Sequence, residues 1–127
     1  MSFPVRIPFL EDLGVVCTKA DAQGCIVELE VKDRHMNSLE VAHGGVTMTL
    51  LDVAQAMAGR FADPDQRGVV TIEMKTSFMR PGTGKMQACG RCIHRTSSLA
   101  FCEAELVDAQ ERVVAKASGT FKYVRKH

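Results

Sequence analysis

Residues 44–58 decide the fold, and they read Gly-Gly-Val-Thr-Met-Thr-Leu-Leu-Asp-Val-Ala-Gln-Ala-Met-Ala. The stretch contains one charge, Asp52, and no polar face wide enough to meet solvent, which is typical of a buried helix. Its alanine, leucine and methionine favour helix, Arg60 would fall in the last turn, and Asp63-Pro64-Asp65 would end it. The sequence therefore predicts one helix from Gly44 to Arg60 that is buried on nearly all sides.

Four long extended runs follow this helix, with turn residues and no helical pattern between them. They cover Val69–Met79, Lys85–Arg95, Leu99–Val107 and Arg112–Val124. Runs that follow each other through short turns predict an antiparallel sheet, and strands of this length would extend roughly 30 to 40 Å. In the first run Val70, Ile72, Met74 and Phe78 share one parity, so we expect them on one face. We expect the sheet to curl around the helix with one face and to meet a second subunit with parts of the other.

The N-terminal third is less regular. Phe3 to Gly14 is expected to form an arm or a short helix, because it carries two prolines and an acidic pair. Two extended runs, Val15–Thr18 and Cys25–Val31, flank a turn at 21–24 and predict a hairpin. The polar stretch from Lys32 to Ala42 is expected to be a functional or mobile loop. No repeat or linker appears, so we predict one α+β domain over residues 1–127.

Composition excludes several classes of protein. The chain has 127 residues, a formal net charge of +1 and 46% apolar residues, which describes a folded domain. A nucleic-acid binder that relies on charge would be more basic, and no apolar run reaches the roughly 20 residues that cross a membrane. Five cysteines without a paired spacing are typical of reduced thiols. We therefore predict a soluble cytoplasmic protein with no nucleic-acid or membrane partner.

Asp52 is the first candidate functional residue. An unpaired carboxylate in an apolar helix is destabilising by several kcal/mol unless it has a partner or neutralises. Asp52 could reach solvent or pair with an arginine across an interface. It could equally be catalytic, since perturbed acids gather at active sites.

The start of the same helix is the second candidate. His43-Gly44-Gly45 precedes the apolar stretch, and a helix N-terminus offers free amide donors to an anion or a polarised carbonyl. A glycine hinge is the simpler interpretation. However, Gly44 and Asp52 are eight residues apart, about 12 Å along one helix, too far to share one carbonyl. A site assembled from two copies of the helix in a symmetric dimer would satisfy that geometry.

Other motifs predict no metal or redox site. Asp33, His35, Asn37 and His43 share the polar loop and the helix start without a settled ligand spacing. The C-x-x-C string at Cys89 and Cys92 lies within a predicted strand, where positions three apart face opposite sides. We predict no metal and no cofactor.

The middle of the chain resembles a known family. The matching residues are Asn37, His43-Gly44-Gly45 after five further residues, Leu50 to Ala54, Val70 to Met74, and Phe78-Met79-Arg80-Pro81. In this order and spacing, over about residues 33 to 124, they resemble the hotdog-fold acyl-CoA thioesterases of the phenylacetate-degradation type. The resemblance implies an antiparallel sheet wrapped around one long helix, and pairing into homodimers or homotetramers. The chain departs from the family at Glu40, where a glycine is usual.

The resemblance also implies a role for each matching residue. Asp52 would be the catalytic carboxylate, as nucleophile or as base for a water, and the Gly44 amide would polarise the thioester carbonyl from the opposite subunit. Asn37 would orient the carbonyl or the water, and Thr71 would lie beside the carboxylate. At the same helix start, His43 would be a further catalytic residue and Gly45 would contact the substrate. The nucleotide end of CoA would lie near Arg80, Ser97, Ser98 and Arg125.

Two other functions stay open. A hotdog hydratase or dehydratase would act on the acyl chain of a similar thioester, but its histidine does not precede Gly-Gly. A non-catalytic acyl-CoA-binding protein would keep the fold, with an apolar or amide residue expected in place of Asp52. Because Asp52 is present, we rank an acyl-CoA thioesterase first. The sequence does not identify the acyl group. It also does not distinguish CoA from acyl carrier protein as the group that carries the acyl chain.

Overall fold

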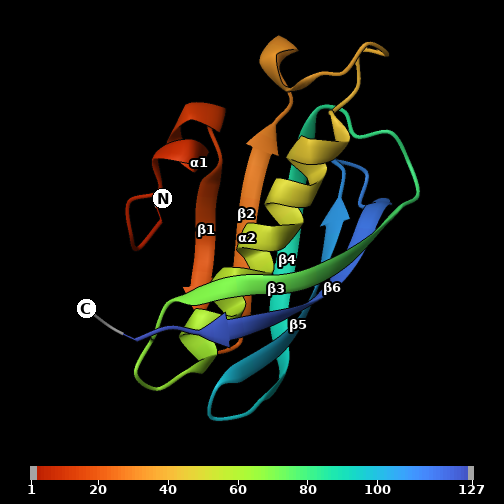
Figure 1. The fold of residues 1–127 in the computed structure, drawn as a ribbon. Coiled ribbons are helices and arrows are strands. Elements are labelled where there is room, and N and C mark those ends of the chain that lie inside the picture. Colours follow the sequence, from red (N-terminus) through yellow and green to blue (C-terminus); the bar gives the residue numbers. More distant parts are fainter. Residues whose placement is uncertain (1–2, 126–127) are drawn as a thin grey trace.

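The computed structural model describes residues 3–125 and places six strands in one antiparallel sheet, in the order β1-β2-β4-β5-β6-β3 (Figure 1). The strands are β1 (Val16–Asp21), β2 (Gly24–Glu30), β3 (Val69–Phe78), β4 (Lys85–Arg95), β5 (Leu99–Val107) and β6 (Val113–Tyr123). The predicted hairpin and the four later strands are confirmed. The sheet curls around one helix, as predicted.

That helix is α2, Gly44–Ala62, which ends two residues beyond the predicted end. It packs its Leu50, Leu51 and Ala54 into the core, where all three are fully buried. The approach to β4 is especially close, because a Cβ atom at Gly90 would lie 2.3 Å from the Ala54 carbonyl oxygen. Only glycine allows this contact, which lets α2 pack closely against the middle of the sheet.

The prediction that α2 is buried on nearly all sides is wrong for one stripe. Gly45 and Met48 are exposed, and Asp52 and Ala56 are half-buried. This stripe borders β3, an edge strand that has no neighbour on its outer side among residues 3–125. The helix is therefore open where the sheet itself ends.

A β-bulge divides β3, because its register against β6 shifts between Thr71 and Glu73. Thr71 pairs with the buried Phe121, and beyond the bulge Phe78 pairs with the buried Ala115. Residues of both parities therefore face α2. The prediction that Val70 and Ile72 share a face with Phe78 is wrong, since a bulge changes the alternation of side chains.

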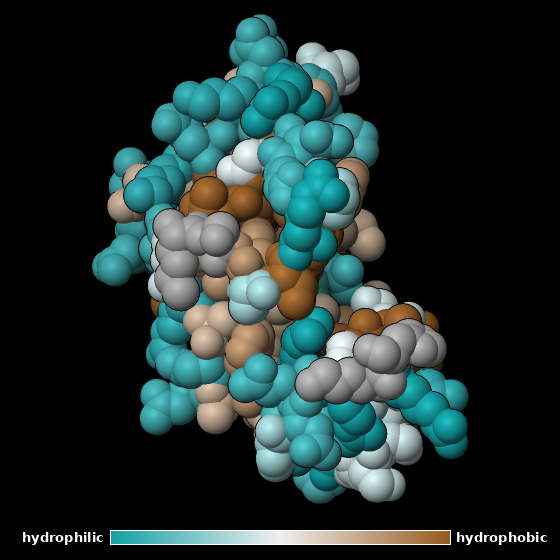
Figure 2. All heavy atoms as spheres, turned by 90° about the vertical axis from the view of Figure 1, so that its left-hand side faces the viewer, coloured by the Kyte–Doolittle hydropathy of each residue, from teal (hydrophilic) through white to brown (hydrophobic). Residues whose placement is uncertain are grey.

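The N-terminal segment contains α1 (Pro8–Leu13), a short helix as expected. Residues Phe3 to Ile7, with Val15 and Val16, line a depression of about 530 Å³ beside α1 and β1. Figure 2 looks at the molecule from the side on which the N-terminal segment lies and shows apolar surface in the middle of this face, framed by polar residues.

The polar loop before α2 is ordered by its own contacts. It contains a short 3₁₀ turn, η1 (Asp33–His35), and an isolated bridge between Met36 and Ala42. His35 is buried and bonds backbone groups through both ring nitrogens, Lys32 N–H at 2.8 Å and Leu13 O at 2.7 Å. Glu40 has a positive φ of 62°, the backbone conformation that a glycine would favour at this position. Within residues 3–125 no helix is long and apolar enough to cross a membrane.

Candidate functional site

Asp52 is held by the edge strand. The Thr71 hydroxyl donates a hydrogen bond of 2.7 Å to Oδ1 of Asp52, which leaves Oδ2 available to a ligand or water. Asp52 lies in the half-buried stripe of α2 that β3 borders. The predicted pairing of Asp52 and Thr71 is present in the structure, with the carboxylate oriented but not enclosed.

The first turn of α2 leaves one amide without an acceptor. His43 accepts the Gly45 N–H at its ring Nδ1 at 2.8 Å, and its carbonyl accepts the amides of Val46 and Thr47 at 2.9 and 3.2 Å. Within residues 3–125 the Gly44 N–H has no acceptor. A free amide at the positive end of a helix can donate to a developing oxyanion.

Phe78 borders this free amide. A Cβ atom at Gly44 would lie 3.7 Å from two ring carbons of Phe78, whose side chain is largely exposed. The Gly44 end and the Asp52 carboxylate lie on the same continuous helix, eight residues apart, so about 12 Å separates them along its axis. One chain therefore carries both groups without bringing them to one carbonyl.

Asn37 shapes its own loop. Its Oδ1 accepts the amides of Leu39 at 2.9 Å and Val41 at 3.4 Å, the Asx geometry that Asn commonly adopts. Within the described chain, its side-chain amide nitrogen has no acceptor. The oxygen of Asn37 is thus structural, and only the Nδ2 donor is left for a carbonyl or water.

The four residues expected near the CoA nucleotide do not gather in one chain. Ser97 and Ser98 occupy the turn between β4 and β5, and Ser98 O accepts the Tyr123 N–H at 2.9 Å, beside the end of β6 that leads to Arg125. Arg80 is instead at the opposite end of β6, where its N–H bonds Val114 O at 3.1 Å. These two ends are roughly 30 Å apart at the usual rise of a strand. A single chain therefore does not bring Arg80 together with the other three, and their common position near CoA stays a prediction.

A family model described as the thioesterase superfamily matches residues 39–115, which include α2 and most of the sheet. The chain belongs to this superfamily. A Pseudomonas aeruginosa protein named "Putative esterase PA0474" is 33% identical over 118 residues, covering 90% of this chain and 87% of that protein. Acyl-coenzyme A thioesterase 13 of Mus musculus is 27% identical over 96 residues, covering 74% and 68%.

Solved structures confirm the hotdog thioesterase fold. The PaaI protein from the phenylacetic acid degradation operon of Escherichia coli superposes with a TM-score of 0.86 at 23% identity, covering 94% of this chain and 86% of that one. The chain therefore shares its fold with this PaaI protein. As a member of the thioesterase superfamily, the chain has the superfamily fold, and its central helix carries Asp52.

The other end of α2 holds a polar cluster that the sequence did not reveal. Asp63, buried at the end of the helix, accepts hydrogen bonds from Arg67 (Nε, 2.9 Å) and Arg95 (Nη2, 2.9 Å). Both guanidinium groups lie against the ring of Tyr123, whose hydroxyl donates to Gly59 O at 2.6 Å. Burial tends to raise the pKa of Asp63, but the bonds from Arg67 outweigh it and the pKa is lowered.

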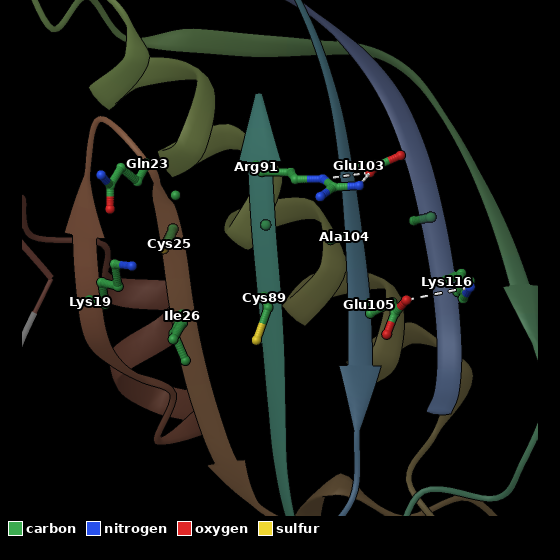
Figure 3. Close-up of a pocket in the computed structure, with 13 residues that line it drawn as sticks. Lys19, Gln23, Cys25, Ile26, Cys89, Arg91, Glu103, Ala104, Glu105 and Lys116 are labelled. Carbon is green, nitrogen blue, oxygen red and sulfur yellow. Dashed lines mark hydrogen bonds and ion pairs between the residues drawn. The ribbon is translucent and has the colours of Figure 1, made fainter. Parts of the chain in front are cut away.

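The outer face of the sheet, away from α2, carries a separate groove of about 570 Å³ (Figure 3). The ion pairs Arg91–Glu103 and Lys116–Glu105 cross it. Cys89 faces this groove, whereas Cys92 packs with the inner cluster around Phe121, so the two cysteines face opposite sides as predicted. The groove contains none of the residues predicted for the site. Within the described part of the chain, no three metal-ligating side chains lie together.

Proposed function

We propose that this member of the thioesterase superfamily is an acyl-CoA thioesterase, which uses water to convert an acyl-CoA into a carboxylic acid and free CoA. One observation carries the proposal: α2 presents a carboxylate oriented by Thr71 and begins with an amide that has no acceptor within residues 3–125. Thioester hydrolysis needs an activated oxygen and an oxyanion donor, and the helix offers one of each.

In this mechanism the Gly44 amide donates to the thioester oxygen as negative charge develops there. Asp52 either attacks the carbonyl carbon itself or takes a proton from the attacking water, while Thr71 holds its other oxygen. The Nδ2 of Asn37 donates to the carbonyl or the water. The C–S bond then breaks, and the CoA thiolate leaves and takes up a proton. If Asp52 is the nucleophile, this step leaves an anhydride between Asp52 and the acyl group, which water then hydrolyses to the acid and the free carboxylate. If Asp52 is the base, it gives the proton it took to the leaving thiolate.

The site would require two copies of the chain, paired along β3. This edge strand is exposed on both faces, and Val70, Ile72 and Phe78 are each at least half exposed. An unpaired apolar edge favours pairing with another strand. Antiparallel pairing of two β3 strands would bring Thr71 and Asp52 toward Phe78 and Gly44 of the partner subunit, which supports a site shared by both.

The same pairing would complete the CoA contacts. Arg80 follows the C-terminal end of β3, so in the pair Arg80 of the partner subunit would approach the end of the sheet that carries Ser97, Ser98 and Arg125. Two arginines and two hydroxyls would suit the phosphates of CoA. Analytical ultracentrifugation at micromolar concentration should find a dimer or tetramer. A monomer that still hydrolyses thioesters would contradict the shared site.

Purified protein should release free thiol from a panel of aryl and aliphatic acyl-CoA thioesters, followed with a chromogenic thiol reagent. The same acyl groups on acyl carrier protein would identify the carrier. Addition of water to an enoyl-CoA without thiol release would instead identify a hydratase. Tight binding without any turnover would support a non-catalytic acyl-CoA-binding protein.

A further inference from the structure

The imidazole of His43 caps the first turn of α2. An α-helix begins with four amides that lack acceptors within the helix. Here they are the amides of His43, Gly44, Gly45 and Val46: His35 O accepts that of His43, the ring of His43 accepts that of Gly45, and the carbonyl of His43 accepts that of Val46. Only the Gly44 amide stays free within residues 3–125, and of the other three only the Gly45 amide is paired by a side chain, the imidazole of His43.

The neighbouring backbone is built around this ring. His43 is itself fixed by a hydrogen bond from its own N–H to His35 O at 2.8 Å. A Cβ atom at Gly45 would lie 3.1 Å from Nδ1 and 3.5 Å from Cε1 of His43. A side chain at Gly45 would therefore press on the imidazole, and its absence lets the ring cap the helix.

The hydrogen bond from Gly45 N–H also defines which ring nitrogen of His43 carries the proton. Nδ1 must be unprotonated to accept the Gly45 N–H, so a neutral His43 carries its proton on Nε2. Nδ1 is then occupied and Nε2 has no free lone pair. In this state neither nitrogen is available as a base.

We propose that His43 is a positioning residue for thioester hydrolysis, which removes the Gly45 amide from competition so that the substrate carbonyl meets the Gly44 amide alone. The inference rests on the proposed thioesterase function. Without the cap, the carbonyl could bond the Gly45 amide in a displaced pose that the carboxylate does not reach. Turnover would fall while ground-state binding would not, because the displaced pose is itself a bound state.

Two variants separate positioning from proton transfer. In His43→Asn, the side-chain oxygen can accept the amide of the second helical residue, as N-capping Asn residues do, but it cannot act as a base. His43→Ala removes the cap. On the best acyl-CoA substrate, we expect His43→Ala to lower kcat by at least about tenfold with KM unchanged or lower. His43→Asn should recover most of the lost kcat.

An NMR measurement tests the cap without activity. Nitrogen chemical shifts of the wild-type imidazole should show Nε2 protonated and Nδ1 bare, and the Gly45 amide proton should move in His43→Ala but much less in His43→Asn. A ring protonated at Nδ1, or a Gly45 amide unaffected in His43→Ala, would overturn the proposal. So would a His43→Asn enzyme as slow as His43→Ala, which would indicate proton transfer by the ring. Absence of thioesterase activity in the wild type, with the cap intact by NMR, would instead refute the proposed function.

Discussion

The two ends of α2 differ in how their polar groups are paired. At the C-terminal end, Asp63 is bonded by two arginines and the Tyr123 hydroxyl donates to a helix carbonyl. At the N-terminal end, the ring and the carbonyl of His43 accept the amides of Gly45 and Val46, and the Gly44 amide has no acceptor within residues 3–125. We call the C-terminal end the closed end, because its polar groups are paired within the chain. We call the N-terminal end the open end, because one of its amides can still bond a ligand.

The difference indicates that the C-terminal end of α2 stabilises the fold, whereas the N-terminal end keeps a hydrogen-bond donor available. Paired buried groups stabilise, whereas an unpaired donor contributes nothing to the folded state unless something else bonds it. The closed end fixes α2 against β4 and β6, so that the open end and the Asp52 carboxylate keep their places. Changes at the open end should therefore affect catalysis, and changes at the closed end should affect folding.

Asp52→Asn should have the largest effect. The amide oxygen can still accept the Thr71 hydroxyl, but it can neither attack a carbonyl nor take a proton. We expect kcat to fall by about 10²- to 10⁴-fold, with the melting temperature unchanged or higher. Thiol-release assays measure kcat and calorimetry measures the melting temperature. The exposed Asp12→Asn is the matched control. A variant that keeps a large part of wild-type kcat would make Asp52 structural.

Gly44→Val should come next. The added side chain meets Phe78, which lies 3.7 Å from the Cβ position, and crowds the approach of a carbonyl to the free amide. Loss of one oxyanion donor lowers kcat about 10²- to 10³-fold. Gly44→Ala is the control, because 3.7 Å is an ordinary contact and the amide stays accessible. Equal losses in both variants would indicate disturbed folding of the turn.

The sequence predicted the architecture closely and the site only in part. Apolar composition fixes α2, and the long extended runs between turn residues fix β3 to β6, because both signals are local. Asp52 stood out as the single charge in an apolar helix. The edge position of β3 depends on the order of the strands in the folded sheet, which local sequence does not reveal. This edge position explains why one stripe of α2 is exposed.

The bulge in β3 is the clearest case of what the sequence could not predict. Strict alternation would place Thr71 and Phe78 on opposite faces, since they are seven residues apart. The register shift at Ile72 turns both toward α2, so that one contacts Asp52 and the other borders Gly44. Likewise, the roles of Asp63 and Arg95 depend on strand ends that meet only in the folded chain.

Asp63→Asn tests the closed end. The substitution weakens the bonds from Arg67 and Arg95, and we expect a loss of roughly 1 to 3 kcal/mol of unfolding free energy. Because the pKa of Asp63 is lowered in the folded state, its contribution is present above the pKa of the unfolded chain and is lost as the pH falls through the folded value. Urea unfolding across acidic pH should show a smaller pH dependence in Asp63→Asn than in the wild type. The exposed Asp65→Asn should behave as the wild type; kcat at neutral pH should be nearly unchanged in both.

Glu40→Gly should have the smallest effect, at the loop that leads to the open end. Glu40 holds a φ of 62°, which disfavours a side chain by about 1 to 2 kcal/mol, whereas glycine adopts it freely. Part of this gain is offset because glycine makes the unfolded chain more flexible, so a net stabilisation of about 1 kcal/mol or less is expected. Ser38→Gly is the matched control in the same loop, since Ser38 lacks a positive φ and the substitution should only destabilise. Thermal unfolding distinguishes the two, and kcat should stay at the wild-type value in Glu40→Gly because Asn37 and His43 keep their bonds. A destabilised Glu40→Gly would mean that the glutamate side chain supports the loop by a contact stronger than the strain it carries.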